Sequence, residues 1–343
     1  MSLTVGPFRG SVDEWNAFAR SAPGWTHFHL AGWRAVVERV HGHECPYLCA
    51  RDEAGRLAGV LPLVRVRSLL FGHYLVSMPF LNYGGPLGSD AAVSALVAHA
   101  VEMAREDGAK LLELRSRQPL PVDLPVSHRK ITVLLDLPAG DAEALFAGLK
   151  AKVRSQVRRP QKEGVTVRFG PEQVAPFFAV FARHMRDLGT PAQPRRLFDA
   201  IAATFGDDAW FGCAYLGERA IACGCGFRWA GEFEMTWASA LVAYNQIAPN
   251  MLLYWAFLER AAKEGVGVFN FGRCTPGGGT HRFKQQWGGR DEPLHWYEHV
   301  PAGGAAKTPS PDDEAYAWGP RLWKRLPVGL ATALGPRIVR GIP

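Results

Sequence analysis

Residues 150–168 form a nearly one-signed basic stretch, which contains seven Lys or Arg residues and a single Glu. The pattern predicts an amphipathic helix that Pro160 kinks or ends. Like charges repel one another along a helix unless an anion offsets them, so the stretch predicts binding to phosphate groups. A solvated helix face is the alternative. The side chains predicted to bind phosphate are Arg154, Arg158, Arg159 and Lys162.

A second candidate site is the segment 269–288, which reads FNFGRCTPGGGTHRFKQQWG. A predicted strand ends there in a glycine-rich loop, where backbone N–H groups can approach a ligand closely. A helix beginning at Thr280 would direct its positive N-terminal end toward an anion, and Lys284 would lie one turn further on. The spacing fits neither G-x-G-x-x-G nor the P-loop pattern, so those nucleotide-binding folds are not indicated. A plain loop with a helical turn is the alternative.

Three residues are candidates for a general base. Glu234 stands between Phe233 and Met235 on a predicted strand, where it would be either a buried carboxylate or an outward-facing strand residue. His184 is the second candidate, although a single His on a helix can equally be structural. His281, beside the glycine-rich loop, is the third. The chain has no Ser-His-Asp order and no Cys-His motif that would indicate a covalent mechanism.

The composition describes an ordinary globular protein of 343 residues, long enough for two domains. Hydrophobic residues make up 48% and charged residues 21%, which excludes disordered, collagen-like and coiled-coil classes. The net charge of +7 is concentrated in 150–168 and in the last residues, on a mildly acidic body. The six cysteines form no C-x-x-C pair, so we expect neither a metal site nor a disulfide framework.

The order of predicted elements in the first half is repeated in the second. Each half reads as helices, a long hairpin, a strand, a helix and a strand, which predicts two α/β domains in tandem. The predicted boundaries are 1–138, 139–300 and a linker with a basic tail at 301–343. The uncharged windows 68–89 and 235–258 contain polar residues near their middles and are not expected to span a membrane, so we expect a cytoplasmic protein.

The motifs of the second half resemble those of the Fem-type acyltransferases. They are RSQVRR from Arg154, DLGTP from Asp187, FGR from Phe271, and the residues Gly279-Thr280, Phe283-Lys284 and Trp287-Gly288. The match covers about 150–298 and is closest to the branch associated with PEP-CTERM/exosortase gene clusters. The first half matches the family only in the spacing of a few residues. The resemblance implies an α/β fold with two GNAT-like (acyl-CoA N-acyltransferase-like) domains.

The resemblance also implies an activity, the transfer of an acyl or aminoacyl group to an amine of a cell-envelope precursor such as peptidoglycan or exopolysaccharide. No cofactor would be tightly bound, and the donor would be aminoacyl-tRNA or acyl-CoA. The motif positions imply that Arg273, Gly279, Thr280 and His281 bind substrate phosphates, and that Lys284 neutralises a phosphate or a developing oxyanion. Other partners would be a lipid-linked precursor and charged tRNA, with the protein acting as a monomer.

Two other functions compete with this hypothesis. The first is an acyl-CoA-dependent acetyltransferase of exopolysaccharide synthesis, but the pyrophosphate loop [RQ]-x-x-G-x-[GA] has no clear copy here. Residues 244–250, at the expected place, contain no glycine. The second is a non-catalytic module that binds tRNA or anionic lipid through its basic segments.

The C-terminal segment 315–343 carries five basic residues and no acidic ones, with Trp and Leu at roughly helical spacing. Such a segment can lie on an anionic membrane at the inner surface. Its prolines and glycines instead predict short turns that pack back onto the domains. Both interpretations stay open at this stage.

Overall fold

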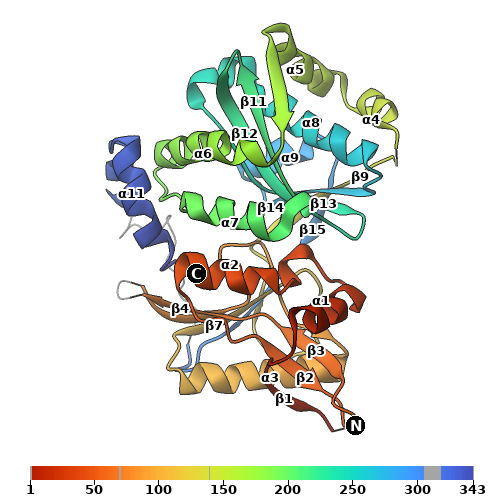
Figure 1. The fold of residues 1–343 in the computed structure, drawn as a ribbon, viewed down its shortest axis with the longest axis vertical. Coiled ribbons are helices and arrows are strands. Elements are labelled where there is room, and N and C mark those ends of the chain that lie inside the picture. Colours follow the sequence, from red (N-terminus) through yellow and green to blue (C-terminus); the bar gives the residue numbers. More distant parts are fainter. Residues whose placement is uncertain (1, 69–70, 139, 305–317, 343) are drawn as a thin grey trace. The chain divides into compact units, whose positions relative to one another are not determined.

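The computed structural model describes residues 2–68, 71–138, 140–304 and 318–342 (Figure 1). The chain divides into two compact units. Unit 1 comprises Met1–Lys130, Pro293–Ser310 and Arg340–Pro343, and unit 2 comprises Ile131–Glu292 and Pro311–Val339.

Within the residues that the structure describes, unit 1 contains two sheets and three α-helices. Its four-stranded sheet has the order β1-β2-β3-β6, and its five-stranded sheet has the order β4-β5-β7-β16-β8. The strands are β1 (Thr4–Pro7), β2 (Leu48–Arg51), β3 (Leu57–Leu61), β4 (Val64–Ser68), β5 (Gly72–Val76), β6 (Leu87–Gly88), β7 (Leu111–Ser116), β8 (Val126–Ser127) and β16 (His295–His299). The helices are α1 (Val12–Ser21), the 3-10 turn η1 (His27–His29), α2 (Gly32–His41) and α3 (Asp90–Glu106). Helix α1 is capped by Ser11, whose hydroxyl accepts from the N–H of Glu14.

Unit 2 has one seven-stranded sheet of order β10-β11-β12-β13-β14-β9-β15, covered by helices on both faces (Figure 1). The strands are β9 (Ile131–Asp136), β10 (Val165–Phe169), β11 (Ala209–Leu216), β12 (Arg219–Trp229), β13 (Glu232–Ala240), β14 (Val268–Cys274) and β15 (Arg290–Pro293). The α-helices are α4 (Ala142–Gly148), α5 (Ala151–Lys162), α6 (Val174–Leu188), α7 (Arg195–Phe205), α8 (Pro249–Lys263), α9 (Gly279–Gln285), α10 (Trp318–Trp323) and α11 (Val328–Val339). The 3-10 turns are η2 (Pro171–Gln173), η3 (Gly206–Asp208) and η4 (Val242–Ile247).

The predicted repetition appears as the same crossover in each unit. In unit 1, β5 and β7 are parallel and are joined through α3; in unit 2, β13 and β14 are parallel and are joined through α8. Each parallel pair has only three paired residues, from Tyr74 to Val76 in unit 1 and from Glu232 to Glu234 in unit 2. In each unit the second strand of the parallel pair also pairs with an antiparallel strand. Strand β7 pairs with β16, and strand β14 pairs with β9.

Those two antiparallel strands correct the sequential domain boundaries predicted at 138 and 300. Strand β9 ends the first half of the sequence but pairs with β14 in unit 2, from Val268 opposite Asp136 to Cys274 opposite Ile131. Strand β16 ends the second half but pairs with β7 in unit 1. Residues 131–136 and 295–299 therefore belong to the opposite units from those expected. Hydrophobic periodicity identifies a strand but not its partner, which is why the prediction was wrong here.

The basic helix also differs in detail from its prediction. The helix begins only at Ala151, because Leu149 is extended and Lys150 is not helical, and these two residues separate α5 from α4. Pro160 lies inside α5, which continues to Lys162. Val153, Val157 and Pro160 are the buried face of α5, and its charged residues lie on the other side.

The C-terminal segment forms two short helices, α10 and α11, and the second packs against α6 (Figure 1). Ala331 and Gly335 are the buried positions of α11. Residues 305–314 of the predicted linker and 315–317 of the tail lie outside the described residues. Within the part that the structure describes, no helix is both long and apolar enough to cross a bilayer.

Candidate active site

Strands β13 and β14 stop pairing with each other at Glu234 and Asn270. Beyond that point β13 continues to Ala240 along β12, and β14 continues to Cys274 along β9. Both strands are irregular just after the separation, with a bulge in β13 between Met235 and Trp237 and a shift in β14 at Gly272. Gly272 has a φ of 74°, in the left-handed region that glycine tolerates best. Bulges of this kind commonly redirect side chains at active sites.

Asn270 organises the side chains at this separation. Its amide nitrogen donates to an oxygen of Glu232 at 2.8 Å and to Oε2 of Glu234 at 3.2 Å. Its amide oxygen accepts from the backbone N–H of Gly272 at 2.8 Å and from the hydroxyl of Thr132. Asn270 is fully buried, and these bonds fix the orientation of its amide. It therefore holds both carboxylates in defined positions.

Glu234 is fully buried, as the hypothesis of a buried base requires. Its neighbours Phe233 and Met235 belong to the hydrophobic core on the α8 side of the sheet, so the alternation of the strand places Glu234 on the other face. Oε1 of Glu234 also accepts from the Thr236 hydroxyl at 3.4 Å. A buried carboxylate held by neutral donors at a strand separation is suited to accept a proton. Its catalytic role stays a prediction.

Lys284 lies on α9 and is 3% exposed. Its ammonium group donates to the carbonyl oxygen of Gly272 at 2.5 Å and to that of Arg273 at 3.0 Å. Burial lowers the pKa of Lys284 to about 8, against the attraction of Cys274 and Glu234, and Arg273 lowers it further. Glu234 and Arg273 are therefore close enough for their charges to act on Lys284. The ammonium of Lys284, however, binds backbone carbonyls.

The glycine-rich loop is closed by His281. The Nδ1 atom of His281 accepts from the backbone N–H of Gly277 at 2.9 Å, and its Nε2 is 3.0 Å from both carboxylate oxygens of Asp291. An acceptor at Nδ1 leaves the Nε2 hydrogen for the carboxylate, so both ring nitrogens are used to hold the loop. This arrangement does not favour His281 as the general base. Gly279 and Thr280 are exposed at the beginning of α9.

His184 lies apart from this cluster. Burial lowers its pKa, partly offset by a hydrogen bond to the carbonyl of Ala240. Ala240 is six residues beyond Glu234 on β13, roughly 20 Å along an extended strand. The structure therefore brings Glu234 and Lys284 together but not His184.

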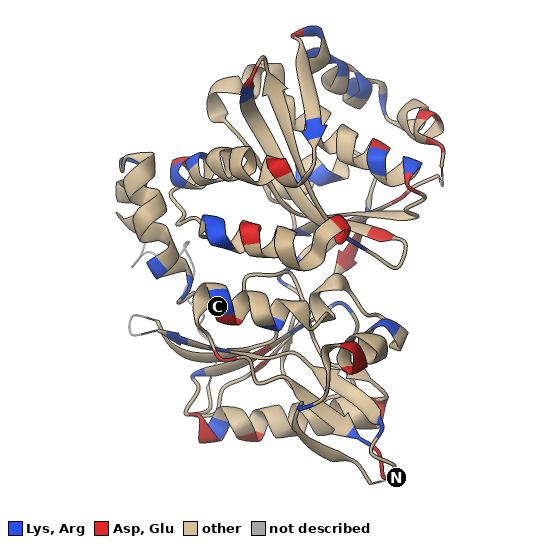
Figure 2. Cartoon of the chain, in the orientation of Figure 1, with Lys and Arg blue, Asp and Glu red and all other residues tan. Residues whose placement is uncertain are grey.

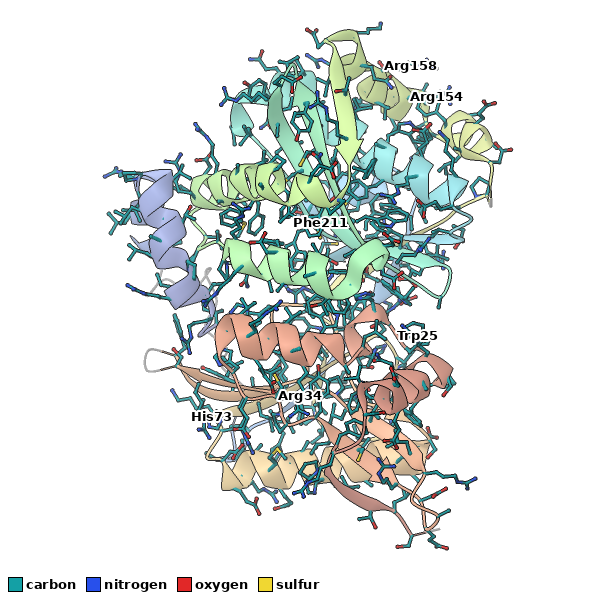
Figure 3. All side chains as sticks on the ribbon, viewed as in Figure 1. Trp25, Arg34, His73, Arg154, Arg158 and Phe211 are labelled. Atoms are coloured by element: carbon teal, nitrogen blue, oxygen red, sulfur yellow. The ribbon has the colours of Figure 1, made fainter. Side chains whose placement is uncertain are left out.

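The basic helix α5 carries a run of Lys and Arg residues (Figure 2), which includes the labelled Arg154 and Arg158 (Figure 3). It packs against α8 and the edge strand β10. Three strands separate β10 from β14, a lateral distance of roughly 19 Å at the usual strand spacing. The predicted phosphate-binding residues on α5 are therefore not part of the same pocket as Lys284.

Two of the four candidate residues on α5 have intramolecular partners. Arg154 donates to the carbonyl oxygens of Ala147 at 2.7 Å and Leu149 at 2.5 Å, where it caps the end of α4. The guanidinium of Arg158 lies 5.2 Å from the ring centre of Phe146. Arg159 and Lys162 are exposed and point their charges to solvent.

Asn270, Thr132 and Glu232 were not predicted from the sequence. A buried Asn between two phenylalanines on a strand was the available signal, because a buried amide requires several partners. Thr132 could not have been found, since it comes from the strand that joins the opposite unit.

Two cavities elsewhere do not contain this cluster. One, in unit 1, has about 100 Å³ and is lined by Tyr83, Gly84, Gly85 and Arg117 among others. It is smaller than ordinary small-molecule pockets, which measure roughly 300–1,000 Å³. The other, in unit 2, is a groove of about 500 Å³ between β10 and α8. Neither is lined by Glu234 or Lys284.

Comparison with known proteins identifies the class of domain. Residues 148–285 match the acetyltransferase (GNAT) domain family, and this span contains Glu234, Asn270 and Lys284. No curated protein sequence matches the chain.

The whole chain resembles several solved structures. FemX has a TM-score of 0.64 and 14% identity, covering 88% of this chain and 98% of that chain. L-PGS from Bacillus licheniformis has a TM-score of 0.56 and 12% identity, covering 94% and 98%. A tandem GNAT protein from the clavulanic acid biosynthesis pathway has a TM-score of 0.55 and 14% identity, covering 89% and 100%. The fold is accordingly the mixed α/β fold of tandem GNAT proteins, which confirms the predicted fold class.

Proposed function

We propose that this chain is an N-acyltransferase that transfers an aminoacyl group from aminoacyl-tRNA to an amine of a cell-envelope precursor. The observation that carries the proposal is the buried Glu234, held by Asn270 where β13 and β14 separate, within the span that matches the GNAT domain family. The Fem-type motifs of the second half support the envelope acceptor.

The proposed reaction is attack of a neutral amine on the ester carbonyl of the donor. A nitrogen–carbon bond forms and the amine proton passes to Glu234; the ester carbon–oxygen bond then breaks, and Glu234 returns that proton to the tRNA oxygen, which leaves as a hydroxyl. General base catalysis of this kind contributes about 10²- to 10⁴-fold. The developing oxyanion needs preorganised donors. Backbone N–H groups on the facing edges of β13 and β14, beyond the last pair at Glu234 and Asn270, are suited to this role.

Two observations favour an RNA donor over acyl-CoA. The connection between β13 and α8, residues 241–248, contains no glycine, and it is mostly the 3-10 turn η4. It therefore lacks the glycine-rich pattern on which a pyrophosphate usually lies. In addition, the exposed charges of α5 lie roughly 19 Å across the sheet from β14. A long polyanion can reach both places at once, whereas these charges are poorly placed for a small donor's phosphates.

The test is a donor comparison with the purified full chain. Labelled aminoacyl-tRNA and acyl-CoA are each incubated with an amine-bearing peptidoglycan precursor, and transfer is followed by mass spectrometry. Transfer from aminoacyl-tRNA alone supports the proposal. Transfer from acyl-CoA alone would overturn the donor assignment in favour of a CoA-dependent acetyltransferase. Binding of tRNA without turnover with either donor would instead indicate a non-catalytic module.

A further inference from the structure

The largest exposed apolar side chains are unevenly distributed over the described residues. Six large hydrophobic side chains stand out as exposed, and three of them belong to one region of unit 2. Leu188 is 52% exposed at the end of α6, Leu322 is 56% exposed on α10, and Leu330 is 46% exposed on α11. Exposed leucines gathered in one region commonly mark an interaction surface.

The position of this region is fixed by contacts between the C-terminal helices and α6. Arg186 donates to the carbonyl oxygens of Lys324 at 3.3 Å and Leu326 at 3.0 Å. A Cβ placed on Gly189 would lie 2.7 Å from the carbonyl oxygen of Pro320, so the end of α6 and the start of α10 touch closely. Leu188 and Leu322 flank this contact. The leucines are therefore presented by packed helices.

Helix α11 uses one face for packing and leaves the other outward. Ala331 and Gly335 are buried, and a Cβ on Gly335 would meet the backbone of Ala192 at 3.0 Å. Leu330, Ala333 and Arg337 are exposed at positions that share the opposite face. This division is typical of an amphipathic helix lying on its own protein, with a second surface left for a partner.

The exposed charges on and just after α10 have one sign. Arg321, Lys324 and Arg325 are exposed on and just after α10, and no acidic residue follows Ala315 in the sequence. The nearest carboxylate along α6 is that of Asp187, which is already paired with Nε of Arg186 at 2.9 Å. We define the tail surface as Leu188, Arg321, Leu322, Lys324, Arg325 and Leu330.

We propose that the tail surface docks unit 2 on a membrane that contains anionic lipid headgroups. Basic side chains complement the surface charge of such a membrane, and the leucines beside them can enter the boundary of its acyl chains. A nucleic acid could bind the same charges, but exposed leucines would not contribute to that binding, because single-stranded nucleic acids are bound through charge and aromatic stacking. The inference does not depend on which donor the acyl transfer uses.

The test measures binding of the full chain to vesicles of phosphatidylcholine with and without phosphatidylglycerol, by co-sedimentation. Binding should require phosphatidylglycerol and weaken with salt. The charge variant R321E/K324E/R325E should lower the partition coefficient by at least on the order of 100-fold, because each basic residue near the surface contributes about a factor of five. The apolar variant L322S/L330S should also weaken binding, at unchanged salt dependence.

Matched controls separate this inference from the proposed function. K150E/K152E/K162E reverses three exposed charges on α5 and at its N-cap, and V12S/V126S removes two other exposed apolar side chains. Both controls should bind anionic vesicles like the wild type, and each variant should keep the wild-type melting temperature. Wild-type binding by the tail charge variant, or no binding of the wild type to anionic vesicles, would overturn the proposal. Loss of tRNA binding in the tail variant with vesicle binding intact would assign the surface to nucleic acid instead.

Discussion

The ammonium group of Lys284 donates to the carbonyl oxygen of Gly272, 2.5 Å away and twelve residues earlier in the chain. Gly272 has a positive φ where β14 bends away from its regular pairing, and its N–H donates to Asn270. Lys284 therefore fixes the backbone that orients Asn270, which in turn holds Glu234. This chain of contacts gives Lys284 a positioning role at the candidate site.

Replacing Lys284 by Met should lower both stability and activity. The carbonyls of Gly272 and Arg273 would lose a charged donor while still buried, at a cost of about 1–3 kcal/mol of unfolding free energy. Activity should fall by on the order of 10²-fold in kcat/KM because the site loosens. Lys263→Met is the control, since Lys263 is exposed and pairs with Glu259 on the surface. A Lys284→Met variant as stable as the control but inactive would show that the ammonium serves the substrate directly.

The free energy of unfolding should depend on pH through the titration of Lys284. The pKa of Lys284 is about 8 in the folded chain and roughly 10.4 in the unfolded chain. Between these two pH values the folded chain has released the Lys284 proton, whereas the unfolded chain still holds it. The unfolding free energy contributed by Lys284 therefore rises with pH from about 8 to 10.4, by roughly 3 kcal/mol. Urea unfolding of the wild type and Lys284→Met across this range measures the difference. A difference that does not change with pH would contradict the lowered pKa.

Glu234 and Glu232 form a matched pair for testing the general base. Both accept from the Asn270 amide, but Glu234 is fully buried and Glu232 is half-buried. Glu234→Gln should lower kcat/KM by about 10²- to 10⁴-fold and remove the acidic limb of the pH–rate profile. Glu232→Gln removes the same charge and should cost less than about tenfold. Equal losses in the two variants would indicate that only the local charge matters.

The basic helix should divide into structural and ligand-binding residues. Arg154→Ala leaves the carbonyls of Ala147 and Leu149 without their charged donor, so it should cost about 1–3 kcal/mol of stability. Arg159→Ala and Lys162→Ala should leave stability unchanged within about 0.5 kcal/mol. Each should weaken tRNA binding and reduce the slope of log K against log salt by about 1. Titrations at several salt concentrations provide the measurement, and unchanged slopes would place the RNA elsewhere.

Much of the local structure could be predicted from the sequence. The predicted strand does end in the glycine-rich loop, and the helix that carries Lys284 begins within one residue of the predicted Thr280. These elements have clear amphipathic patterns or glycine boundaries, and such signals depend only on residues close in the sequence. Glu234 and Lys284 were predicted from separate segments, and in the structure the charge of Glu234 acts on Lys284.

Tertiary structure alone decided what these residues contact. Thr132 meets Asn270 only because β9 joins the sheet of unit 2, a pairing that no local pattern encodes. The charge of Arg154 predicted a phosphate ligand, but the break at Leu149 turned two carbonyls toward it. Residue type and spacing determine which element forms and which face it buries. Strand partners and the direction of a long charged side chain depend instead on packing across the whole sheet, because they are selected by groups distant in the sequence.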